Sequence, residues 1–383
     1  MRGEGKPVLL FLNHWAAHLG GAEFSLIDIL DISARRAQVH LVTSENGELV
    51  RRAKEMGVSC HVIFCRKGLE RIRRSNLLFK AFLNLPSLVS FLIFFFRVRR
   101  LVLQIRPDCI HANVPKSHIL LLLLKLMGYQ NRSVFHIREI FQKESFAYKL
   151  YRQLFKPVDS TVIAISNAVR NALPENMKQN SVLIYNGIPM PPPSVLKSQK
   201  QSGINFVYLG RIVPWKGCHL LIEAFSKVNS KHKEKQLSLT LAGGTFYWSE
   251  SYRDELRRLI SAHGLDTRCF LLPHVANVYS FLARHDVFCT AALDEPFGRS
   301  VAEAQSCALP VIAFDSGGIP EIVENGISGV LVRRAEVEEY SRAMEKFILD
   351  PPLALRMGLA GQSMTKGMFN SSVQIPRIVQ ELL

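Results

Sequence analysis

Residues 294–332 constrain the fold of this chain more than any other part of the sequence. This stretch opens with a turn at residues 296–298 and continues as a helical pattern that ends before Pro310. The apolar run at residues 311–314 predicts a buried strand, and a loop rich in glycine and proline follows at residues 317–320. This order of loop, helix, strand and loop is typical of parallel α/β sheets, which bind ligands at the carboxyl ends of their strands.

Two glutamates flank the start of that helix. Glu295 precedes the turn, and Glu303 follows eight residues later, inside the helical pattern. A helix that begins after a glycine turn presents unpaired backbone N–H groups to an anion, here from Gly298, Arg299 and Ser300. Carboxylates beside such a phosphate site can accept hydrogen bonds from sugar hydroxyls and from a ribose diol. The stretch therefore predicts a nucleotide-sugar site, whereas an isolated pair of glutamates would more often be surface acids.

The same residues resemble a known family. Glu-Pro-Phe-Gly at 295–298, Glu303, Pro-Val-Ile at 310–312 and Gly-Gly-Ile-Pro-Glu at 317–321 resemble family 4 of the retaining glycosyltransferases. The resemblance implies the GT-B fold, an α/β architecture in which two Rossmann-like, doubly wound parallel-sheet domains face each other across a cleft. It also implies that Glu295 is catalytic and that Phe297 belongs to the donor-binding loop.

Domain limits follow from length, composition and charge. The chain has 383 residues, and prolines with polar residues at 189–203 are typical of a linker. We therefore expect an N-terminal acceptor-side domain at 1–188 and a nucleotide-sugar-binding domain at 204–364. In the implied fold, the segment 365–383 crosses back to the first domain. The seven cysteines include no CxxC pair, and this usage fits a reducing cytoplasm.

The positive charge is concentrated in the first half of the chain. Residues 1–190 hold 27 Lys and Arg against 13 Asp and Glu, a net charge of +14, whereas residues 191–383 hold 21 against 19, a net charge of +2. This asymmetry predicts an anionic partner for the N-terminal half. Nucleic acid is disfavoured because no recognised binding motif accompanies the charge.

Residues 66–106 combine ten basic residues with one acid and many Leu and Phe residues. This composition predicts a helix lying on an anionic membrane surface, at the cytoplasmic side of the membrane, and interruptions by polar residues and proline disfavour a spanning helix. An ordinary helix pair packed on the sheet remains an equal alternative. The residues assigned to acceptor or membrane contact are Arg71, Arg73, Arg74 and Lys80.

Two further candidate sites lie in the first half. Gly20 and Gly21 stand between the first strand and the first helix, where a glycine pair permits close approach to a ligand; a simple loop is the alternative. His136 ends an expected strand at 133–136, and read alone it is as well explained by the core as by function. The resemblance implies that Gly20 and Gly21 face the donor diphosphate and that His136 contacts the donor sugar. His111 is the weaker candidate.

A basic loop opens the second half. Gly210 and Arg211 follow an expected strand, and Lys216 stands five residues after Arg211. Two cations on such a loop can clamp a diphosphate, although a solvated basic loop is common. The resemblance to the family's G-R-x4-K-G motif implies that Arg211 and Lys216 bind the diphosphate. No DxD triad lies in the candidate site, so we expect no metal and no cofactor besides the donor.

These observations predict a hexosyltransferase that moves a sugar from a UDP or GDP sugar to a saccharide or lipid-linked acceptor. The pathway implied is bacterial cell-envelope polysaccharide or lipopolysaccharide biosynthesis. Two alternatives remain at this point. One is a nucleotide-sugar 2-epimerase of the same fold, and the other is a non-catalytic scaffold at the membrane.

Overall fold

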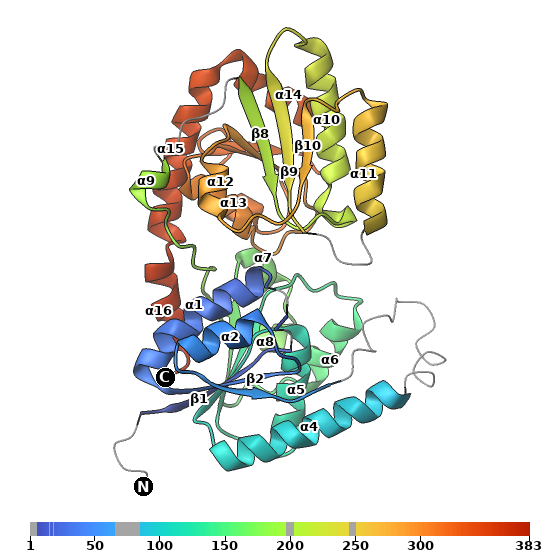
Figure 1. Cartoon of the computed structure of the whole chain (residues 1–383). Helices are drawn as coiled ribbons and strands as arrows, with labels where there is room; N and C mark the ends of the chain where they lie inside the picture. Colours follow the sequence, from blue (N-terminus) through green and yellow to red (C-terminus); the bar gives the residue numbers. More distant parts are fainter. Residues whose placement is uncertain (1–5, 15, 18, 66–84, 197–202, 245–249) are drawn as a thin grey trace. The chain divides into compact units, whose positions relative to one another are not determined.

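The computed structural model describes residues 6–14, 16–17, 19–65, 85–196, 203–244 and 250–383. These residues form two compact units, and Figure 1 labels many of their helices and some of their strands. Unit 1 comprises Met1–Ile165, Arg170–Ile184 and Gln374–Leu383, and unit 2 comprises Ser166–Val169 and Tyr185–Val373. The chain therefore enters unit 2 briefly after residue 165 before its main transfer at residue 185.

Unit 1 is built on a seven-stranded parallel sheet with strand order β3-β2-β1-β4-β5-β6-β7. Its strands are β1 (Val8–Leu12), β2 (Gln38–Thr43), β3 (Ser59–Val62), β4 (Cys109–Ala112), β5 (Arg132–Ile137), β6 (Ser160–Ala164) and β7 (Ser181–Leu183). Its helices are α1 (Gly21–Arg36), α2 (Glu48–Glu55), α4 (Leu85–Ile105), α5 (Pro115–Leu126), α6 (Phe146–Leu154), α7 (Asn167–Asn171), α8 (Glu175–Lys178) and α16 (Ser371–Gln380), of which α7 and α16 cross the boundary between the units.

The end of the chain completes the core of unit 1. Ile375, Ile378 and Val379 of α16 are buried in one cluster with residues of β1, α1 and α2. Arg377 also donates a hydrogen bond to the carbonyl of Leu183 in β7. Burial of this apolar face, rather than local propensity, explains why a helix with Pro376 in its interior forms here.

Unit 2 is built on a six-stranded parallel sheet with strand order β10-β9-β8-β11-β12-β13. Its strands are β8 (Ile204–Leu209), β9 (Leu237–Ala242), β10 (Cys269–Leu272), β11 (Val287–Thr290), β12 (Val311–Phe314) and β13 (Gly329–Val332). Its helices are α9 (Pro193–Leu196), α10 (Cys218–Lys231), α11 (Glu250–Ala262), α12 (Val278–Leu282), α13 (Arg299–Ser306), α14 (Val337–Leu349) and α15 (Pro351–Met368), with 3-10 turns η2 (Pro214–Lys216) and η4 (Ile319–Glu321).

Helices cover this sheet as expected for strands that are apolar throughout. Helices α10 and α14 pack against each other and against the strands, and their buried side chains share one core cluster with β8, β9 and β12. Helix α13 lies against α15 and against strands β11 and β12. The predicted α/β class with two parallel sheets is therefore confirmed.

Strand β3 lies earlier in the sequence than expected. The apolar run at residues 62–65 predicts the third strand there, but β3 occupies Ser59–Val62. It is an edge strand that pairs only with β2, so its polar first residues do not give the buried pattern on which the expectation relied. The predicted contact residues Arg71, Arg73, Arg74 and Lys80 lie outside the described residues. Within the described part of the chain, no helix has the length and apolarity that crossing a membrane requires.

Candidate active site

The strand order of unit 2 reverses between β8 and β11. These two strands are neighbours in the sheet, although β9 and β10 lie between them in the sequence. At such a reversal the loops after the two strands diverge, and ligands of α/β sheets bind in the space between them. The loop after β8 carries Arg211 and Lys216, and the loop after β11 carries Glu295.

The structure joins these two loops through an ion pair. The ammonium of Lys216 contacts Oε2 of Glu295, and both side chains are 18% exposed. The backbones also meet, because Leu293 N–H donates to the carbonyl of Trp215 at 3.1 Å. Two predicted site residues that are 79 positions apart in the sequence are therefore in direct contact.

Glycines allow this close approach. Gly217 follows Lys216 with φ 68°, and a Cβ placed there would lie 2.2 Å from the carbonyl oxygen of Ala291. Gly317 has φ 62°, and its Cβ would lie 2.1 Å from the carbonyl oxygen of Glu295. That same oxygen accepts a hydrogen bond of 2.7 Å from Gly318 N–H. The glycine pair after β12 thus holds the backbone of Glu295 in place.

A second ion pair lies on α13, which begins directly after the Glu295 loop. Arg299 Nε donates to Glu303 Oε1 at 2.8 Å, with 17% and 12% of the two side chains exposed. The helix starts after Gly298, whose φ of 104° few other residues adopt. The first N–H groups of a helix have no acceptor within the helix, so this end of α13 suits an anion.

Two of the predicted donor-binding residues are held by close packing against other residues of unit 2. Phe297 is 2% exposed, and its ring lies 5.6 Å from that of Phe369 and 6.2 Å from that of Tyr185. Its side chain therefore anchors the loop, and only its backbone can face a ligand. Gly210 directly follows β8 and packs so closely on Gly243 that a Cβ at Gly243 would lie 1.7 Å from the Gly210 carbonyl oxygen.

Arg211 lies at the same edge of the sheet with an exposed side chain. Its carbonyl accepts a hydrogen bond of 2.8 Å from the hydroxyl of Tyr208. Burial raises the pKa of Tyr208 well above its usual value, so this hydroxyl keeps its proton and remains a donor. The buried Tyr208 therefore fixes the main chain at Arg211 through this hydrogen bond.

Glu321 holds residues 166–169 beside the Glu295 loop. The sequence indicated Glu321 only as the last residue of a motif. Its carboxylate accepts hydrogen bonds from Asn167 N–H at 2.7 Å, Ala168 N–H at 2.8 Å and the Tyr185 hydroxyl at 3.1 Å. The neighbouring Ser166 hydroxyl donates to the Pro296 carbonyl at 2.5 Å. These contacts explain why residues 166–169 belong to unit 2.

In unit 1, the strand order reverses between β1 and β4, and polar residues gather where these strands end. Asn113 Nδ2 donates to Asn13 Oδ1 at 3.0 Å and lies 3.4 Å from the carbonyl of Ala22, just after the predicted Gly20 and Gly21. Gly20 N–H is bonded to the carboxylate of Glu23 at 3.0 Å. Asn13 and Asn113 each follow a strand directly, and that shared position was the signal from which the sequence could have found them.

The structure places His136 inside the core, which is one of the two interpretations that the sequence left open. Strand β5 continues to Ile137, and His136 is 0% exposed. Its Nδ1 lies 3.1 Å from His111 Nε2 and 3.3 Å from Arg138 Nη2. Burial, with the charge of Arg138, lowers the pKa of both histidines well below the usual value. Because Arg138 can only donate, His136 is neutral with its proton on Nε2.

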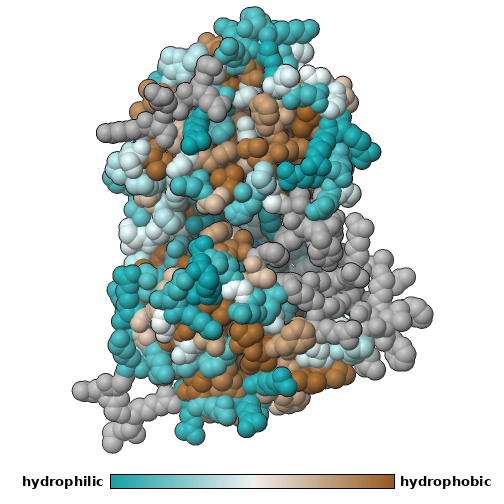
Figure 2. Space-filling view, viewed as in Figure 1, coloured by the Kyte–Doolittle hydropathy of each residue, from teal (hydrophilic) through white to brown (hydrophobic). Residues whose placement is uncertain are grey.

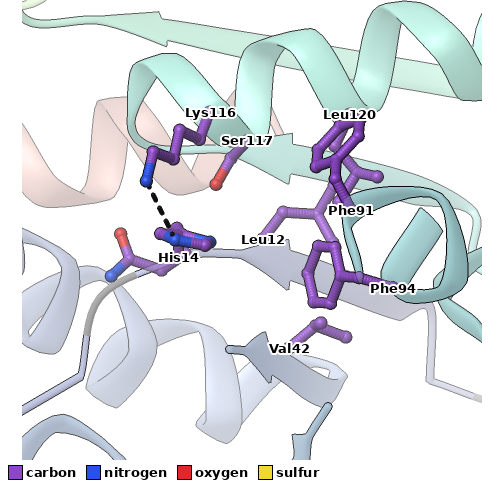
Figure 3. Close-up of a pocket in the computed structure, with 9 residues that line it drawn as sticks. Leu12, His14, Val42, Phe91, Phe94, Lys116, Ser117 and Leu120 are labelled. Carbon is purple, nitrogen blue, oxygen red and sulfur yellow. Dashed lines mark hydrogen bonds between the residues drawn. The ribbon is translucent and has the colours of Figure 1, made fainter. Parts of the chain in front are cut away.

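A small cavity lies beside Asn13 in unit 1 (Figure 3). Its volume is about 10 Å³, which corresponds to room for about one water molecule. His14 and Lys116 approach each other on one side at 3.2 Å, and Phe91 and Phe94 of α4 form the opposite, apolar side. The described residues contain no group of three or more His, Cys, Asp or Glu side chains placed to hold a metal ion.

Two family models match this chain, and solved structures share its fold. Residues 197–364 match the family model "Glycosyl transferases group 1", and residues 19–190 match "Glycosyltransferase Family 4". The structure of HepE from Anabaena in complex with UDP and glucose is similar, with TM-score 0.80 and 23% identity over 98% of both chains. Sucrose-phosphate synthase from Thermosynechococcus elongatus is similar with TM-score 0.78 and 17% identity over 98% of both chains. The chain therefore belongs to the group 1, family 4 glycosyltransferases and has the GT-B fold.

Curated relatives match to different extents. The capsular polysaccharide biosynthesis glycosyltransferase CapM of Staphylococcus aureus is 24% identical, over 88% of each chain. A D-inositol 3-phosphate glycosyltransferase of Corynebacterium jeikeium is 30% identical over 42% of this chain and 40% of its own length. The chain thus spans less than half the length of that relative.

Proposed function

We propose that this protein is a retaining glycosyltransferase. It moves a hexose from a nucleoside diphosphate sugar to an acceptor hydroxyl, without a metal ion. The observation that carries the proposal is the ion pair of Lys216 and Glu295 where β8 and β11 end, beside the N-terminus of α13. Retention of the anomeric configuration is proposed from family membership.

The ion pair suggests how the donor is received. The ammonium of Lys216 contacts the carboxylate of Glu295, which holds this cation beside the proposed position of the diphosphate. A bound diphosphate carries more negative charge than one carboxylate, so it competes for Lys216 and releases Glu295 to accept hydrogen bonds from the sugar hydroxyls. Arg211 and the first N–H groups of α13 add positive potential for the same diphosphate.

The same groups would promote the reaction. When the bond between the sugar and the diphosphate breaks, its electron pair stays on the diphosphate. The acceptor oxygen forms the new bond to the sugar, and the proton of the acceptor hydroxyl passes to the departing diphosphate oxygen. Lys216 and Arg211 stabilise the charge that grows on the leaving group, as a metal ion does in other enzymes. Removing one such donor commonly raises the barrier by about 3–4 kcal/mol.

Glu303 is proposed to bind the ribose of the nucleotide. It lies one helical turn beyond Arg299 on α13, and its carboxylate is already held by that side chain. The structures of HepE contain UDP, UDP and glucose, or UDP-glucose, so UDP sugars are the first donors to test. CapM is named for capsular polysaccharide biosynthesis, which supports an envelope saccharide or its lipid-linked form as the acceptor. We still predict that the donor is contacted by His136, Gly20 and Gly21.

The decisive test measures donor turnover in the Lys216→Ala variant. Lys227→Ala is the matched control, because Lys227 forms an exposed ion pair with Glu338 on the surface of unit 2. We expect the Lys216 variant to lose at least about 100-fold in kcat and the control to keep it. Activity that is unchanged by Lys216→Ala, or that depends on an added divalent metal in the wild type, would contradict the proposal. The anomeric configuration of the product, read by NMR, tests retention.

A further inference from the structure

Helix α4 is apolar on two opposite faces. Phe94, Phe95, Val98 and Val102 are at most 5% exposed and pack into unit 1. The other face exposes six large apolar side chains, each between 45% and 57% exposed: Leu88, Val89, Leu92, Ile93, Phe96 and Leu103. Most of these are spaced by four residues, so they form one continuous stripe on the surface.

The stripe is visible on the surface of the protein. In Figure 2, brown atoms lie along the edge of the molecule where Figure 1 shows α4. Exposed apolar residues are common when they occur singly, whereas a contiguous stripe of this kind marks an interaction surface. The described residues therefore leave α4 with an apolar face that no other described element covers.

The charges beside this stripe have one sign. Arg97 and Arg100 are exposed on α4, Arg99 is half-buried there, and Arg106 follows the helix. The helix itself contains no aspartate or glutamate. An apolar face bordered by arginines and free of acids is complementary to an anionic bilayer, which offers acyl chains to the stripe and phosphate groups to the guanidinium groups.

A second copy of the chain is a poorer partner for this face. In a symmetric dimer the same patch meets itself, so the arginines of the two copies would approach each other with no acid on α4 to neutralise them. The net charge of +14 over residues 1–190 would repel in the same way. The charge pattern thus favours lipid over self-association.

We propose that the outer face of α4 is a docking surface for an anionic lipid bilayer. The apolar stripe enters the interface, and Arg97, Arg99 and Arg100 contact lipid phosphates. This inference deepens the proposed function, because it brings the protein to the surface where a lipid-linked acceptor resides. Binding of α4 to lipid requires neither donor nor turnover, so the two proposals can fail independently.

Vesicle flotation of the full chain tests the docking surface. Vesicles of phosphatidylcholine alone are compared with vesicles that also contain phosphatidylglycerol, at low and high salt. We expect binding to the anionic vesicles only, and at least tenfold weaker binding by the variant Leu92→Gln/Phe96→Gln. The variant Arg97→Gln/Arg100→Gln should bind about 30-fold more weakly, at about fivefold for each arginine.

A matched control separates docking from general surface polarity. Leu355 and Leu359 on α15 are 64% and 52% exposed and have the same spacing of four residues. The variant Leu355→Gln/Leu359→Gln should float like the wild type. All three variants should bind a nucleoside diphosphate normally, because none of the substituted residues belongs to the proposed donor site.

Three results would overturn the proposal. The first is equal flotation of the α4 variants and the wild type. The second is a loss of thermal stability in Leu92→Gln/Phe96→Gln with unchanged flotation, which would show that the chain itself covers this face. The third is a dimer in sedimentation that the α4 variants convert to a monomer while flotation stays unchanged, which would assign the face to a second copy.

Discussion

Lys216 and Glu295 form an ion pair across the reversal in strand order of unit 2. The two side chains come from loops that follow adjacent strands, and glycines at 217 and 317 let the two loops approach closely. The pair is partly accessible to solvent, with 18% of each side chain exposed. It is therefore placed where a bound anion can replace Glu295 as the partner of Lys216.

The variant Glu295→Gln should separate a functional ion pair from a structural one. Because the pair is only partly exposed, loss of the carboxylate leaves Lys216 without its partner, and we expect the free energy of unfolding to fall by about 1.5–3 kcal/mol. The kcat of sugar transfer should fall at least about 100-fold, because the carboxylate that orients the sugar is lost. Urea unfolding and donor turnover measure the two effects. A large loss of stability with normal turnover would assign the pair to the fold.

Glu303→Gln should weaken the binding of a nucleoside diphosphate more than the binding of pyrophosphate. Hydrogen bonds to charged groups contribute about 1.5–3 kcal/mol, so UDP should bind about 10-fold to 100-fold more weakly. Pyrophosphate, which has no ribose, should bind as it does to the wild type. Calorimetry on both ligands gives the comparison. Glu339→Gln is the control, because Glu339 forms an exposed ion pair with Arg333. Equal losses for both ligands would refute the ribose assignment.

Gly317→Ala should destabilise unit 2. A methyl group at this position would lie 2.1 Å from the Glu295 carbonyl oxygen, at a φ of 62°. Strain of this kind costs about 1–3 kcal/mol, and displacement of the Glu295 backbone should also reduce turnover. Gly367→Ala in α15 is the control, since a methyl group placed there would meet no atom within 4 Å; it should be neutral or slightly stabilising. Equal stability of the two variants in urea unfolding would contradict this account.

Histidines in the core of unit 1 predict a loss of stability in mild acid. Burial lowers the pKa of His118 from 6.5 to about 4, and its ring is held by the carbonyls of Ala112 and His136 and by the Tyr151 hydroxyl. A folded-state pKa below the unfolded value means that protonation favours the unfolded chain. The stability is thus full above about pH 6.5 and falls as the pH decreases toward 4.

At about 1.4 kcal/mol per pKa unit, the lowered pKa of His118 corresponds to a loss of about 3 kcal/mol in the free energy of unfolding as the pH falls from about 6.5 to about 4. Urea unfolding between pH 7.5 and 4.5 measures the slope. His118→Gln should be less stable at pH 7.5 but should lose less stability on acidification. An identical slope in the variant would show that other groups control the acid response.

The sequence predicted the fold well because its signals are local. Apolar runs such as residues 8–12 and 311–314 mark strands of parallel sheets, which are buried on both faces, and glycine turns mark the loops between strands and helices. The edge strand β3 was misplaced because it lies at the border of the sheet. Its residues are exposed or half-buried, and they do not form an apolar run.

The candidate site was predicted unevenly. The pairing of Arg299 with Glu303 follows from a spacing of four on one helix and was open to prediction. The pairing of Lys216 with Glu295 depends on which strands are neighbours, and no local pattern contains that information. The burial of His136 depends on which side of β5 is covered, so the sequence could not decide between a core residue and an exposed one.

The central claim is that Lys216 exchanges Glu295 for the diphosphate of the donor. Titration calorimetry of UDP and GDP with the wild type, Lys216→Ala and Glu295→Gln tests it most directly. The account predicts that Lys216→Ala binds the preferred nucleotide at least tenfold more weakly, and that Glu295→Gln binds it as tightly as the wild type or more tightly, because Lys216 no longer has a competing partner. Wild-type affinity in Lys216→Ala, or a loss in Glu295→Gln as large as the loss in Lys216→Ala, would contradict the claim.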